Sequence, residues 1–121
     1  MPLLSMRAWF ALCLLGLACP APPPLPDAGP TCTVVAPETC TRPELRFADV
    51  QPTFQTHCVN CHYGQAGGPW PLSSYSDIAD WSDVVRADLV TCSMPLADGG
   101  TNMTDEERLL ILDWLRCGNP Q

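Results

Sequence analysis

Residues 58–62 read Cys58-Val59-Asn60-Cys61-His62, and the fold of so small a chain depends on what this stretch holds. Two thiols separated by two residues can act on one group, and an imidazole follows them directly. Taken alone, a Cys-x-x-Cys pair is compatible with a thiol–disulfide redox couple, a zinc site or an attachment point for haem. The residues around the pair have to decide between these chemistries.

The histidine of this stretch favours haem. A histidine directly after the second cysteine completes the Cys-x-x-Cys-His pattern to which haem is covalently attached. The two thiols add to the two vinyl groups of one porphyrin, and the imidazole gives the iron a neutral nitrogen ligand. We therefore expect one covalent haem c, bound through Cys58 and Cys61, with His62 as an iron ligand.

The N-terminus has the character of an export signal. Arg7 is followed by an apolar stretch that is too short to cross a bilayer and that ends at Cys19. The end of this stretch resembles a bacterial lipoprotein signal, except that Gly16 stands where a leucine is usual. We expect residues 1–18 to be a signal peptide and Cys19 to be lipidated, which gives an exported, membrane-anchored lipoprotein. Cleavage without lipidation would give a periplasmic protein, and a retained signal anchor is a third possibility.

The chain is acidic, with a formal net charge of −7, and it contains no lysine. Loss of residues 1–18 removes one arginine and no acid, which makes the net charge −8. Such a charge argues against binding to nucleic acid and against electrostatic binding to anionic membranes. We expect redox partner proteins with a basic or apolar docking patch.

Eight cysteines in 121 residues indicate an oxidising compartment. Four remain once Cys13 in the signal, Cys19 and the pair in residues 58–61 are set aside. These four allow three disulfide pairings, and four free thiols are the alternative. We favour one short loop ahead of the domain and one bridge to the C-terminal helix, namely Cys32–Cys40 and Cys92–Cys117.

Composition divides the chain into three parts. Prolines dominate residues 20–30, so residues 19–42 read as an extended spacer with a small disulfide loop. The folded domain is expected over residues 43–121. So small a hydrophobic core needs an additional source of stability, which a covalently held haem supplies.

Helical spacing predicts an all-α fold. Phe47, Val50 and Phe54 lie on one face of a first helix, in which Pro52 marks a start or a kink. A second helix is expected over residues 77–89 with Ser76 as its cap. A third begins at the capping box of residues 104–107 and continues through an apolar run to Leu115.

A haem iron that shuttles electrons needs a second axial ligand. His57 is too close to the attachment site to reach the opposite haem face, and no lysine is present. Met94, in a loop before the third helix, is the favoured ligand, with Met103 as the alternative. If both methionines only fill space, the iron is five-coordinate or binds water.

Several motifs in residues 47–118 occur together in one family. They are a Val-x-Pro lead-in, Cys-x-x-Cys-His, a Gly-Gly turn, a Ser-Tyr helix start, Met-Pro and a final Trp-x-x-x-Gly. In this chain they are Val50 to Pro52, Cys58 to His62, Gly67-Gly68, Ser74-Tyr75, Met94-Pro95 and Trp114 to Gly118. The segment resembles a bacterial class I-type, single-haem cytochrome c domain. The resemblance implies thioethers at Cys58 and Cys61 and iron ligation by His62 and Met94. The family often has a second proline after Met-Pro, where this chain has Leu96.

Other residues near the motif have possible roles at the haem. The carbonyls of Pro69 and Pro71 are candidates to accept the second ring proton of the histidine ligand, although a role as turn residues explains either proline equally well. Four further side chains are candidates for contacts with haem or its propionates, although core or surface packing explains each of them as well. These are Trp70, Tyr75, Trp81 and Arg86.

The expected function is single-electron transfer by a His/Met-ligated haem c. The protein is not expected to be an enzyme on its own, and it can act either alone or as a subunit of a larger oxidoreductase. Two alternatives stay open. One is a haem-based enzyme subunit or gas sensor with an open distal position. The other is a thiol–disulfide redox protein that uses Cys58 and Cys61, although such pairs usually lie at a helix start in a βαβ context.

Overall fold

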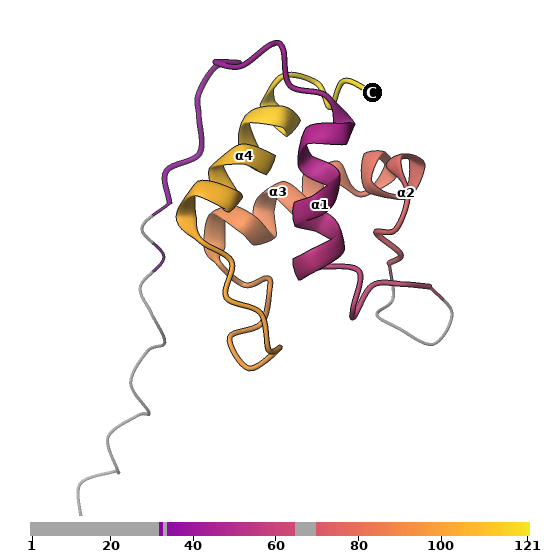
Figure 1. Cartoon of the computed structure of the whole chain (residues 1–121). Coiled ribbons are helices and arrows are strands. Elements are labelled where there is room, and N and C mark those ends of the chain that lie inside the picture. Colours follow the sequence, from indigo (N-terminus) through magenta and orange to yellow (C-terminus); the bar gives the residue numbers. More distant parts are fainter. Residues whose placement is uncertain (1–31, 33, 65–69) are drawn as a thin grey trace, which may run out of the picture.

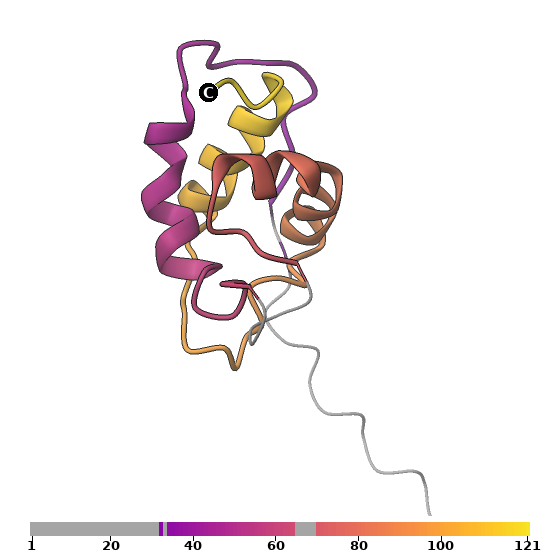
Figure 2. The ribbon, with the colours of Figure 1, turned by 90° about the vertical axis from the view of Figure 1, so that its right-hand side faces the viewer.

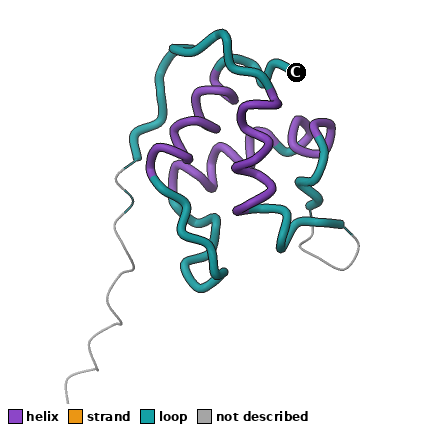
Figure 3. Tube along the Cα trace, viewed as in Figure 1, coloured by secondary structure: helices purple, strands orange, loops and turns teal. Residues whose placement is uncertain are grey.

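The computed structural model describes residues 32, 34–64 and 70–121. These residues form four helices and no strand, so the prediction of an all-α fold is confirmed for the described part of the chain (Figures 1 and 3). The helices are α1 (Phe47–His57), α2 (Tyr75–Asp80), α3 (Ser82–Thr91) and α4 (Asp105–Arg116). Helix α4 packs against both α1 and α3, and α2 leads directly into α3.

The core lies between α1 and α4, which run side by side (Figure 1). Trp114 of α4 is completely buried, and its indole ring meets Phe54 of α1 edge-on with 6.2 Å between ring centroids. Val50 and Ile111 are also completely buried. The helical spacing expected for α1 is therefore confirmed. Pro52 lies inside α1 rather than at its start, and because it has no N–H it leaves a gap in the hydrogen-bond ladder of the helix.

The single helix expected over residues 77–89 is two helices in the structure. Helix α2 begins after Ser74, whose hydroxyl accepts a hydrogen bond from the Asp77 N–H, so Ser74 and not Ser76 is the cap. The chain leaves helical geometry at Trp81, and α3 begins at the next residue. Ser74 and Ser76 are equally good capping residues, and the side chain of Asp77, which accepts a hydrogen bond from Ser74, favours the earlier one.

Helix α4 begins as the capping box predicts. The Thr104 hydroxyl accepts a hydrogen bond from the Glu107 N–H, and the Glu107 carboxylate accepts one from the Thr104 N–H at 2.8 Å. The helix ends at Arg116, and Gly118, two residues later, has a φ of +87°, which favours glycine. The chain then turns back over the core, where the Pro120 carbonyl accepts from the indole N–H of Trp114 at 2.8 Å.

Disulfides join the N-terminal segment to the helices, and they correct the predicted pairing. Cys32 pairs with Cys92 and Cys40 pairs with Cys117, so neither Cys32–Cys40 nor Cys92–Cys117 forms. All four cysteines are bridged, as predicted. The pairing prediction was wrong because it assumed short loops, whereas the observed bridges span 60 and 77 residues. The segment from residue 34 passes over one end of the bundle and brings these cysteines to the ends of α3 and α4 (Figures 1 and 2).

Polar contacts also hold this segment against α4. Thr41 and Arg42 both bind the buried carboxylate of Asp113, at 2.6 and 2.8 Å. Near the end of the helix, Arg116 donates to the Pro37 carbonyl at 2.9 Å. The docked part of the chain therefore begins before residue 43, where we expected the domain to begin.

The expected signal peptide, the lipidation site Cys19 and the proline-rich run lie outside the described residues. Within residues 32, 34–64 and 70–121, no helix has the length and apolar character needed to cross a bilayer.

Candidate functional site

The Cys-x-x-Cys-His stretch forms a tight turn at the C-terminal end of α1. Cys58 caps the helix, and its N–H donates to the Phe54 carbonyl at 2.9 Å. The N–H of His62 in turn donates to the Cys58 carbonyl, also at 2.9 Å. This turn holds the imidazole and the first thiol on the same side of the chain. Cys58 and Cys61 are both free thiols, and Cys58 is partly buried whereas Cys61 is exposed.

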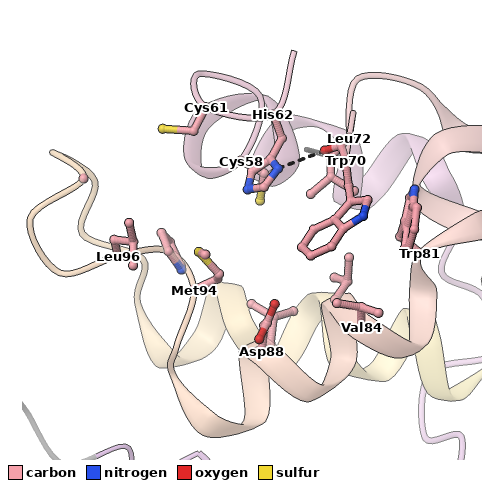
Figure 4. Close-up of a pocket in the computed structure, with 14 residues that line it drawn as sticks. Cys58, Cys61, His62, Trp70, Leu72, Trp81, Val84, Asp88, Met94 and Leu96 are labelled. Atoms are coloured by element: carbon pink, nitrogen blue, oxygen red, sulfur yellow. Dashed lines mark hydrogen bonds between the residues drawn. The ribbon is translucent and has the colours of Figure 1, made fainter. Parts of the chain in front are cut away.

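An apolar pocket of about 250 Å³ opens beside this turn (Figure 4). In Figure 4 the imidazole of His62 and the sulfur of Cys58 point into the pocket from one side, and Met94 faces them from the other. The sulfur of Cys61 points to the side, at the rim. The remaining lining is mainly apolar, with Asp88 as the one acid. It comes from the segment before α2, the junction of α2 and α3, α3 itself and the loop after α3: Trp70, Leu72, Trp81, Val84, Val85, Asp88, Leu89, Pro95, Leu96 and Gly99.

The orientation of His62 is set by a main-chain contact. Its Nδ1 lies 2.9 Å from the carbonyl oxygen of Trp70, which a protonated Nδ1 satisfies as a donor. The Nε2 atom is then left without a proton and free to act as a ligand. The carbonyls of Pro69 and Pro71 were the candidates for this role. Pro69 lies outside the described residues, and the acceptor observed is the carbonyl of the residue just before Pro71.

The two candidate methionines lie in different places. Met94 lines the pocket opposite His62. Met103 is partly buried against the core and lines a separate, more polar cavity beside Cys92 and Arg108. The structure therefore brings Met94 together with the Cys-x-x-Cys-His turn and places Met103 elsewhere.

His57 is not among the residues that line the pocket. Its imidazole is almost fully buried between α1 and α4, and its Nε2 lies 3.2 Å from the Glu107 carboxylate without the alignment of a hydrogen bond. The pKa of Glu107 is lowered, first by the hydrogen bond from the Thr104 N–H and then by His57. The position of His57 agrees with its exclusion as a ligand from the sequence.

The other side chains singled out in the sequence divide into two groups. Trp70 and Trp81 line the pocket, with 5.2 Å between their ring centroids. Tyr75 instead packs edge-on against Phe47, and its hydroxyl donates to the Asn119 carbonyl. Arg86 is not among the residues that line the pocket.

Arg108 and Asp88 were missed by the sequence reasoning. Asp88 lines the pocket from α3. Arg108 is buried in α4 and donates to the carbonyl of Met94 at 2.7 Å. In the sequence Arg108 directly follows three acids at a helix start, where an arginine ordinarily reads as a solvent-exposed charge.

The free thiol of Cys58 is expected to be unreactive at neutral pH. Burial raises its pKa to about 11, the charge of Arg108 opposes this rise, and Cys61 adds to it. A thiol with a raised pKa stays protonated at neutral pH, whereas redox-active cysteines have lowered pKa values.

The burial of Cys58 and the exposure of Cys61 predict selective alkylation of the haem-free protein. At pH 8 we expect iodoacetamide to modify exposed Cys61 and to leave Cys58 mostly unmodified, because only about a thousandth of the Cys58 thiol is ionised three units below its pKa. Modification of Cys58 should rise as the pH approaches 11, since the thiolate is the reactive form. Peptide mass spectrometry after timed labelling measures both sites. Equal modification of both at pH 8 in a folded sample would contradict the prediction.

The donor set is sparse for an isolated metal ion. Within the described residues, no three His, Cys, Asp or Glu side chains converge as they would around a metal. What converges is one imidazole, one thioether and one buried thiol, with a second thiol at the rim, around apolar walls. These groups share one apolar pocket, with His62 and Met94 on opposite sides of it. Comparison of the chain with models of known families, with curated proteins and with solved structures finds no match.

Proposed function

We propose that the protein is a single-electron carrier with one covalently attached haem c. In this proposal Cys58 and Cys61 would hold the haem covalently through thioether bonds, and His62 and Met94 would bind its iron. One observation carries the proposal. A single apolar pocket brings Cys58, His62 and Met94 together from segments that are more than thirty residues apart in the chain.

The residues around the pocket match what such a carrier needs. A bound haem would supply reversible one-electron exchange at its iron. The Trp70 carbonyl holds His62 in one tautomer and one orientation. The soft sulfur of Met94 would favour the ferrous state of a bound haem, and the apolar walls would limit the access of water. Both residues come from segments fixed by hydrogen bonds, so little would have to move between the two oxidation states of a bound haem.

The fold also supports the expected location and partners. Two disulfides indicate an oxidising compartment, so we propose an exported protein that is periplasmic or anchored in a membrane through Cys19. Trp70, Val84 and Leu96 line the pocket and are 38%, 38% and 53% exposed. We propose that a redox partner docks over this opening with an apolar or basic surface, since the chain itself is acidic.

The proposal is tested by making the protein in a bacterial host competent for cytochrome c maturation. We expect a red protein whose polypeptide mass is increased by one haem and which keeps a haem stain on a denaturing gel. The double variant Cys58→Ala, Cys61→Ala should lose the stain, whereas Met103→Leu should retain it. A colourless wild-type protein without the added mass would overturn the proposal.

The same preparation separates the two alternative functions. Rapid binding of carbon monoxide by the reduced wild-type protein would indicate an open distal position and hence a haem enzyme or sensor. A haem-free protein whose Cys58 and Cys61 cycle between dithiol and disulfide would indicate a thiol redox protein. The raised pKa of Cys58, caused mainly by burial, argues against the second alternative.

A further inference from the structure

We infer that Arg108 is a positioning residue that holds Met94 in place as the distal ligand. This inference rests on the proposed function. It assigns a role in iron ligation to a side chain that lies on a different helix from every proposed haem-binding residue.

The contact is direct and buried. Arg108 is only 8% exposed, and its Nη1 donates to the carbonyl oxygen of Met94 at 2.7 Å. The same nitrogen lies 3.5 Å from the carbonyl of Leu89, near the end of α3. A guanidinium that donates to a carbonyl makes a charge-assisted hydrogen bond, which is stronger than a neutral one. Arg108 therefore ties the loop of Met94 to the start of α4.

The other side of Met94 is held from α3. The Met94 N–H donates to the Asp88 carbonyl at 3.4 Å, and the Ser93 hydroxyl donates to the Asp88 carboxylate at 2.7 Å. Beyond Met94 the loop is exposed from residue 96 to residue 100. Only Pro95 separates Met94 from this exposed stretch, and Arg108 fixes the Met94 carbonyl on that side.

The charge of Arg108 and its hydrogen bond to Met94 both act to raise the midpoint potential of the haem. The guanidinium is close enough to the pocket to oppose the rise in the Cys58 pKa that burial causes. A buried positive charge near the iron disfavours the more positive ferric state. Loss of Arg108 would free Met94 to dissociate, mainly from ferric iron, and would remove this charge. Both effects lower the midpoint potential.

The test compares three variants of the haem-containing protein. Arg108→Gln removes the charge, and Arg108→Lys keeps a charge but changes the donor geometry. Arg116→Gln is the control, because Arg116 lies on the same helix and also donates to a main-chain carbonyl, but to that of Pro37 and not to that of Met94. Three quantities are measured for each: the weak far-red band of methionine-ligated ferric haem, the midpoint potential and the affinity of ferric haem for added imidazole, which competes with Met94.

For Arg108→Gln we expect a weakened far-red band, a lower potential and an imidazole affinity raised by about tenfold or more. For Arg108→Lys we expect an intermediate rise in imidazole affinity, and for Arg116→Gln no change. A purely structural role would lower the melting temperature and leave these properties of the folded variants at wild-type values. If Arg108→Gln does not fold, Arg108→Lys decides, since it keeps a long stem and a buried cation.

The outcomes separate this inference from the proposed function. The inference would be overturned if folded Arg108→Lys, and Arg108→Gln where it folds, kept the wild-type potential and imidazole affinity. The proposed function would still stand in that case, provided that the wild-type protein contains haem and shows the far-red band. A wild-type protein without haem, or without the far-red band, would overturn both.

Discussion

Replacing Met94 with leucine is expected to abolish the far-red absorption band of the ferric protein and to open the iron to carbon monoxide in the ferrous protein. Leucine preserves the size and apolar character of the side chain in the pocket but has no donor atom. The midpoint potential should fall by an appreciable part of the roughly 0.8 V range that axial ligands span. Optical spectra, a redox titration and carbon monoxide binding measure the three effects.

Met103→Leu is the matched control for this experiment. Met103 is partly buried like Met94, but it lines the other cavity, so we expect spectra and potential to stay at wild-type values. Loss of the far-red band in Met103→Leu, with the band retained in Met94→Leu, would reverse the proposed ligand assignment.

Replacing Trp114 with alanine is expected to produce the largest loss of stability in the domain. Trp114 is completely buried between α1 and α4, and its ring centroid lies within 6.4 Å of those of three aromatic neighbours, Phe47, Phe54 and Tyr75. Truncation of such a side chain costs about 3–5 kcal/mol. It also removes the indole donor to the Pro120 carbonyl. Urea unfolding followed by circular dichroism measures the change.

The control for stability is Val35→Ala. Val35 is 81% exposed, so its truncation should change the free energy of unfolding by less than about 0.5 kcal/mol. A loss of under about 1 kcal/mol for Trp114→Ala would contradict the assignment of Trp114 to the centre of the core.

The parts of the fold that follow from local chemistry were predictable. The capping box at Thr104 and the apolar run behind it specify α4, and the spacing of Val50 and Phe54 specifies the buried face of α1. Both signals act within one or two helical turns, so no tertiary information is needed to read them. The boundary between α2 and α3 was not predictable in this way, since Trp81 continues the apolar face while its backbone leaves the helix.

The disulfide pairing was beyond the reach of the sequence for a different reason. Four cysteines allow three pairings, and the entropy cost of closing a loop favours the shortest loops. The observed bridges instead depend on the path of residues 34–42 over the ends of the helices, which is set by contacts such as the one between Arg42 and Asp113. Nothing in the spacing of the cysteines records that path.

The candidate site was also predictable only in part. The residues that line the pocket around Cys58, His62 and Met94 include those expected from the motifs. The groups that orient them were missed, namely the Trp70 carbonyl and the Arg108 guanidinium. A carbonyl has no sequence signature, and an arginine in a charged helix start does not reveal that it points inward.

The bridge from Cys32 to Cys92 has a mechanical consequence. Any tension that reaches the domain along the N-terminal segment arrives at Cys32 and is transferred through a covalent bond to the end of α3. The load bypasses the non-covalent contacts of residues 34–42 and enters the fold two residues before Met94. Pulling on the tether of an anchored molecule would therefore strain the end of α3 and the adjoining loop of Met94 before it strained the contacts of residues 34–42.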